Sequence, residues 1–128
     1  YETIDGLAGW RGGHTDVEGL LDFVPHFNTT DDVVCYARTN IVAPREMDTT
    51  LRLGSNDGVI VWLNGEQILN RNDGRDALPD QDILPVHLVE GANSLLVKVS
   101  NLGGWGWKLY FSADDPEREL VYRTAVAR

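Results

Sequence analysis

Short runs of apolar residues, separated by turn-forming residues, recur along the whole chain. The sharpest is Val-Ile-Val-Trp-Leu at residues 59–63, which follows Asn-Asp-Gly and precedes Asn64-Gly65. An unbroken run rich in β-branched and aromatic residues predicts a strand buried on both faces, with Trp62 in the core. Asn-Gly favours a type I′ turn, because both central residues of that turn need a positive φ. The pattern therefore predicts a β-hairpin over residues 58–70.

Alternation of apolar and polar positions predicts the other strands. Over residues 33–42, Val33 and Cys35 fall on one face, whereas Val34 and Tyr36 fall on the other. Further strands are predicted at residues 20–23, 49–53, 83–89, 95–99, 107–111 and 120–126. Pro85 indicates that its strand lies at a sheet edge, since proline cannot donate to a ladder. We therefore predict an all-β fold, an antiparallel β-sandwich or jelly roll of about eight strands.

Length and charge exclude several classes of protein. The 128 residues suit one domain, residues 1–128, and contain no apolar stretch near the twenty residues that span a membrane. Without such a stretch, a membrane is not an expected partner. The formal net charge of −9 repels phosphate backbones, so nucleic acid is not an expected partner either. A start on Tyr1 rather than methionine leads us to expect a segment of a larger protein. Cys35 is the sole cysteine and is predicted to be a buried thiol.

Four segments of the chain resemble a known family. Residues 34–39, 53–65, 91–99 and 103–107 are similar to the galactose-binding-domain-like jelly rolls, which occur as carbohydrate-binding modules and in β-galactosidase-type glycoside hydrolases. The resemblance implies a non-catalytic module fused to a polysaccharide-active enzyme or a surface protein. Its ligand would commonly lie on loops at one end of the sandwich, and sometimes on a concave sheet face. It also implies an exported protein, extracellular or periplasmic, whose signal peptide lies outside this segment. A structural calcium ion is frequent in that family, although no cofactor is required.

Aromatic residues in the glycine-rich segment are candidate sugar platforms. Trp105 lies between Gly104 and Gly106, and a flat indole matches the apolar face of a sugar ring. The alternative is a lid over the core. Trp107 begins an alternating strand, so a core position competes with a role in binding.

Polar residues of the turns and of the long loop Asn70–Asp82 could bind sugar hydroxyls. Asn56 and Asp57 precede the central strand, and their alternative role is to satisfy their own backbone as Asx-turns. On the loop, Arg71, Arg75 and Asp76 offer donors and acceptors, and an arginine would suit an acidic sugar. The alternative is a set of solvated loop charges. The loop also carries oxygen ligands suited to calcium, but without the EF-hand spacing: Asp73, Asp76, Asp80 and Asp82.

We therefore predict a carbohydrate-binding module that holds a polysaccharide-active protein near its poly- or oligosaccharide. No catalytic constellation is recognisable, so the segment itself is not expected to be an enzyme. One alternative is a structural accessory domain that packs against a neighbouring catalytic domain without binding sugar. Another is a non-catalytic wall of a composite active site, lined by the long loop. The predicted carbohydrate-binding residues are Trp105, Trp107, Asn56, Asp57, Arg71, Arg75 and Asp76.

Overall fold

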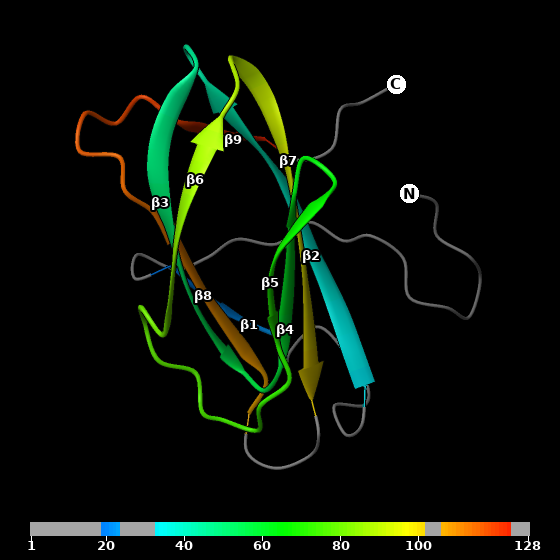
Figure 1. Ribbon diagram of the computed structural model, residues 1–128. Helices are drawn as coiled ribbons and strands as arrows, with labels where there is room; N and C mark the ends of the chain where they lie inside the picture. The colour runs from blue at the N-terminus through cyan, green and yellow to red at the C-terminus, as the bar shows by residue number, and fades with distance from the viewer. Residues whose placement is uncertain (1–18, 24–32, 102–105, 124–128) are drawn as a thin grey trace.

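Two antiparallel sheets form the part of the chain that the computed structural model describes, residues 19–23, 33–101 and 106–123 (Figure 1). The four-stranded sheet has the order β1 (Leu20–Asp22), β8 (Lys108–Ala113), β3 (Met47–Asn56), β6 (Asp82–Leu88). The five-stranded sheet has the order β5 (Glu66–Arg71), β4 (Val59–Leu63), β7 (Gly91–Asn101), β2 (Val33–Ala43), β9 (Val121–Arg123). The prediction of an all-β antiparallel sandwich is confirmed. None of the described elements is a helix that could cross a membrane.

The core lies between the two sheets and is built from alternate residues of their strands. In β7 the buried side chains include Leu95, Val97 and Val99, and in β3 they include Leu51 and Leu53. Successive side chains of a strand point to opposite faces, so this period of two leaves the other face of each sheet toward solvent. Each sheet therefore has an inner face on the core and an outer face.

Cys35 lies in this core, as predicted. Burial raises the pKa of its thiol to about 11, because the thiolate would lose its hydration. The side chain is therefore a neutral thiol at physiological pH.

The central hairpin is present, but its first strand is buried on one face only. Asn64 and Gly65 have φ angles of 51° and 82°, so the positive φ expected for the Asn-Gly turn is confirmed. In β4 the buried residues alternate with Ile60 and Trp62, which are partly exposed. The prediction that Trp62 belongs to the core is therefore wrong. The reason is that the five-stranded sheet has the second sheet packed on one of its faces, and Trp62 is on the other.

The connections between strands cross repeatedly from one sheet to the other. β6 is one edge strand of the four-stranded sheet, as Pro85 indicated, and β5 is one edge strand of the five-stranded sheet. The long connection between them runs past the end of the sandwich where β3 turns into β4 (Figure 1). The fold thus places the long loop beside the Asn56–Gly58 turn, although the two segments are far apart in sequence.

Candidate functional site

Five of the predicted site residues come together at this end of the sandwich. They surround the carboxylate of Asp82, the first residue of β6, and they are Asn56, Asp57, Arg71, Arg75 and Asp76. The structure thus brings the turn before β4 and the long loop next to each other. We call this set, together with Asp82, Ser55 and Gln81, the loop-end cluster.

A buried ion pair forms the centre of the loop-end cluster. Arg71 donates from Nε to one oxygen of Asp82 at 2.7 Å, and Arg75 donates from Nη2 to the other at 2.5 Å. The Asp82 side chain is 2% exposed, against 16% for Arg75 and 47% for Arg71. Burial alone would raise the pKa of Asp82, but the hydrogen bonds and charges of Arg75 and Arg71 outweigh it. The pKa of Asp82 is therefore held below its ordinary value.

The remaining polar groups of the cluster hold the loop against β3. Arg75 donates to the Ser55 carbonyl at 3.2 Å and to the Ser55 hydroxyl at 3.0 Å, and its own backbone N–H donates to Asp57 at 3.2 Å. The Gln81 side chain donates to the backbone carbonyl of Asp76 in the same loop at 2.7 Å. It also accepts from the backbone N–H of Ser55 at 2.9 Å. The donors and acceptors of the cluster thus bond to one another, and these bonds hold the long loop against β3.

The backbones of β3 and the long loop also approach each other closely. A Cβ on Gly54 would lie 1.6 Å from the carbonyl oxygen of Leu78, so β3 must present glycine where the loop crosses it. Ser55 and Gln81 were not predicted as site residues, and Asp82 was considered only as a loop aspartate. The available signal was the position of Asp82: it begins an alternating strand in phase with inward-facing Leu84 and Val86.

The two tryptophans predicted as sugar platforms have different outcomes. Trp105 lies outside the described residues. Trp107 is 1% exposed, its ring lies 5.2 Å from that of Phe23, and its Nε1 donates to the carbonyl of Val99 at 3.3 Å. The prediction of a sugar-binding Trp107 is wrong, because its side chain, directly before β8, is buried in the core.

Within the described residues, no group of three or more His, Cys, Asp or Glu side chains is arranged to hold a metal ion. Of the four loop aspartates considered for calcium, Asp82 has both carboxylate oxygens bonded to arginines. Asp73 also lies beside Arg71, at 3.5 Å. The carboxylate oxygens that calcium would need at Asp82 are thus bonded to arginine guanidinium groups.

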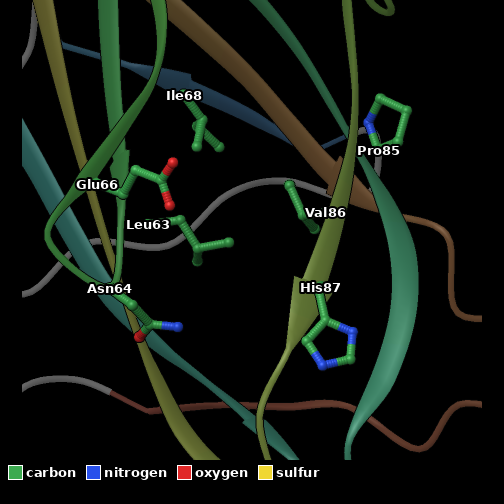
Figure 2. A pocket seen from close by; sticks show the side chains of 7 residues that line it. All are labelled: Leu63, Asn64, Glu66, Ile68, Pro85, Val86 and His87. Atoms are coloured by element: carbon green, nitrogen blue, oxygen red, sulfur yellow. The ribbon is translucent and has the colours of Figure 1, made fainter.

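A pocket of about 300 Å³ opens between the β4–β5 hairpin and β6 (Figure 2). Leu63 and Ile68 point into it from the hairpin, and Val86 faces them from β6. At its rim His87 is held between two carboxylates: Nδ1 is 2.7 Å from Asp48 and Nε2 is 2.6 Å from Glu46. This pocket is the gap between the free edges of the two sheets, and its other lining residues are Asn64, Glu66 and Pro85.

His87 is expected to titrate above the ordinary histidine pKa of 6.5. The hydrogen bonds to Asp48 and to Glu46 favour the doubly protonated ring and raise its pKa. Its contribution to stability is then fully present below the unfolded pKa and is lost as the pH rises through the folded one. An NMR titration of the ring protons would measure this. The double variant Asp48→Asn, Glu46→Gln should return the pKa toward 6.5, and an unchanged value would contradict the assignment.

The outer face of the five-stranded sheet carries a group of large apolar side chains. Register places Lys98 between Ile60 of β4 and Tyr36 of β2, and Leu96 between Trp62 and Arg38. Tyr36 is 45% exposed and Val34, two residues before it, is 49% exposed. We call the outward-pointing residues of β5, β4, β7, β2 and β9 the outer face. Its aromatic and aliphatic members include Val34, Tyr36, Ile60, Trp62 and Leu96, all of them exposed or partly exposed.

Comparison with known proteins gives one informative likeness. No family model matches the chain, and no curated protein matches it. Among solved structures, the chain is similar to one described as an "anti-sigma factor domain-containing protein", with a TM-score of 0.57 and 17% sequence identity. The match covers 85% of this chain and 37% of that one, so the chain spans little more than a third of its length. At this identity the likeness shows the fold.

This comparison corrects the family and the function inferred from sequence. The structural neighbour is not a galactose-binding module, and neither a family model nor a curated protein supports that family. The predicted carbohydrate-binding module, with its polysaccharide partner, is therefore wrong. The physical reason lies in the residues that carried the resemblance. They are turn formers and core apolar residues, which build antiparallel sandwiches of many functions.

Proposed function

We propose that this chain is a non-catalytic domain that binds a partner protein through the outer face of its five-stranded sheet. The observation that carries the proposal is the grouping of Tyr36, Trp62, Ile60 and Leu96 on that face, all at least partly exposed. Aromatic residues dominate the binding energy of protein interfaces, since they bury a large area at a small entropic cost. A sheet face of this composition is suited to a protein partner.

The structural neighbour suggests which partner to test first. Its printed description names an anti-sigma factor domain, so a sigma factor is the first candidate. The loop-end cluster supports a non-catalytic role, because its carboxylates and guanidinium groups are engaged with each other. Export from the cytoplasm stays a prediction that a sigma-factor partner would oppose, because sigma factors act in the cytoplasm, and cell fractionation would test it.

The binding proposal is tested with two matched surface variants. Tyr36→Ser should raise the Kd for a sigma factor of the source organism by about tenfold or more, as expected for a hot-spot aromatic. Ile83→Ser is the control, because Ile83 is 53% exposed on the other sheet, where it pairs with Arg52. Isothermal titration calorimetry would measure both. Circular dichroism would verify that both variants stay folded.

Two outcomes would contradict the proposal. If Ile83→Ser weakens binding and Tyr36→Ser does not, the partner binds the four-stranded sheet and not the outer face. If no sigma factor binds the intact chain at micromolar concentration, the sigma-factor partner is lost.

A further inference from the structure

The pocket between the β4–β5 hairpin and β6 lies between edge strands of the two sheets. Its apolar lining comes from the core side of these strands, where Leu63 and Val86 are buried and Ile68 is partly buried. Trp62, the neighbour of Leu63 in β4, points instead to the outer face. The pocket is therefore separate from the surface proposed to bind a protein, and neither proposal depends on the other.

Three polar side chains line the pocket, and two of them already have partners in this chain. The Asn64 amide donates to Asn93 at 2.9 Å and accepts from a backbone N–H of β7 at 2.9 Å. The ring of His87 is held between two carboxylates. Within the described part of the chain, no hydrogen bond or ion pair engages the Glu66 carboxylate. Figure 2 shows this carboxylate turned toward the space between the hairpin and β6.

The charge around the pocket is negative. On the hairpin side there is the carboxylate of Glu66. On the β6 side the ring nitrogens of His87 lie 2.7 Å from Asp48 and 2.6 Å from Glu46, so these three side chains keep a net negative charge even when the ring is doubly protonated. The chain as a whole has a net charge of −9. A cationic ligand is therefore favoured over a neutral or anionic one.

The size and lining of the pocket suit a small molecule. A volume of about 300 Å³ is at the lower end of the range for small-molecule sites, which are mainly apolar with a few polar groups. An ammonium group bonded to Glu66 would place an attached hydrocarbon group against Leu63 and Ile68. Such a ligand would gain a charge-assisted hydrogen bond and bury apolar area at the same time.

An added β-strand of a partner is a poorer occupant of the same gap. Pro85 lies in β6 and lines the pocket. It has no N–H, so an incoming strand would lack a donor at this position of the edge.

We propose that this pocket binds a small organic amine. Its protonated amino group would be held by Glu66, and its compact aliphatic or aromatic group would pack on Leu63, Ile68 and Val86. This site is additional to the protein-binding outer face.

The test is a titration of the intact, isotope-labelled chain, followed through its backbone amide NMR signals, with phenethylamine as the probe. Saturable shifts should be confined to the β4–β5 hairpin, β6 and their immediate neighbours, with a Kd on the order of 1 mM. Phenethyl alcohol keeps the ring and removes the charge, whereas ethylamine keeps the charge and removes the ring. Each should bind at least about fivefold more weakly than phenethylamine.

Glu66→Gln should weaken the binding of phenethylamine by about fivefold or more, because it removes the charge and nearly keeps the shape. The matched control is Glu117→Gln, which removes an exposed carboxylate between β8 and β9 and should bind normally. β9 and β5 are at opposite edges of the five-stranded sheet, so the control measures attraction by the acidic surface alone. Both positions are exposed, and both variants are therefore expected to fold.

Four results would overturn the proposal. Shifts spread over the whole chain, or equal losses in Glu66→Gln and Glu117→Gln, would mean that the amine follows the net charge. Equal affinities for phenethylamine and ethylamine would exclude the apolar contact. Tighter binding of a blocked lysine tripeptide would assign the pocket to a side chain of a partner protein. Loss of amine binding in Tyr36→Ser would place the amine on the outer face, whereas failure of the sigma-factor experiment would leave this inference unchanged.

Discussion

Trp107→Ala is expected to lower the free energy of unfolding by about 3–5 kcal/mol, the range for removing a buried large aromatic side chain. Trp107 is 1% exposed, packs on Phe23, and donates its indole N–H to the carbonyl of Val99. The variant would leave a cavity in the core and remove the hydrogen bond to the Val99 carbonyl. Urea denaturation followed by circular dichroism would measure the loss.

Trp107→Phe is the companion variant, since it keeps an aromatic ring and removes the N–H. Its loss should be clearly smaller than that of the alanine variant, because less volume is removed. A loss below about 1 kcal/mol for Trp107→Ala would mean that the indole is at the surface. That result would restore Trp107 as a candidate contact residue.

Asp82→Asn is expected to destabilise the fold by about 3 kcal/mol, since breaking a buried ion pair leaves a charge without its partner. In this variant the guanidinium of Arg75, 16% exposed, would remain in the cluster without a carboxylate. Arg71 is better placed to turn toward water, because 47% of its side chain is exposed. The control is Asp73→Asn, which alters an exposed aspartate beside Arg71 and should change stability by less than about 0.5 kcal/mol.

The pH dependence of this loss has a definite sign. Because the folded pKa of Asp82 is lowered, its contribution is present above the unfolded pKa, near the ordinary value of 3.8. It disappears as the pH falls through the folded pKa. The stability difference between Asp82→Asn and the unsubstituted chain should therefore be full at neutral pH and shrink in acid below about pH 4. A difference that stays constant down to pH 2 would contradict the ion pair.

The strands themselves could be read from local patterns. Alternation over residues 33–42 predicted β2, and the structure has it as Val33–Ala43 with Cys35 inward and Tyr36 outward. The positive φ angles at Asn64 and Gly65 follow from the turn chemistry of those two residues. The strand predicted over residues 95–99 is longer in the structure than its apolar run. β7 already begins at Gly91, and buried Asn93 donates to the carbonyl of Ile41 at 3.1 Å.

Five of the eight residues of the loop-end cluster could be predicted as site residues, but their role could not. These five residues are polar and lie next to turns, so they were identified as candidates for a ligand. Whether such groups bind a ligand or one another depends on distances between segments remote in sequence. Ser55 and Gln81 are 26 residues apart, yet the Ser55 N–H donates to Gln81. Only the folded arrangement shows that the cluster holds the loop to β3.

The sequence by itself determined where this chain forms strands, where its central hairpin turns and that its fold is all-β, because these features depend on side-chain period and on local φ preferences. The tertiary structure decided which apolar residues remain at the surface and which charges gather together. Trp62 is outward because a single sheet covers β4, and Lys98 lies between Ile60 and Tyr36 because β7 pairs with β4 and β2. The order of strands in a sheet depends on pairing between residues that are distant along the chain. A local sequence pattern therefore cannot predict it.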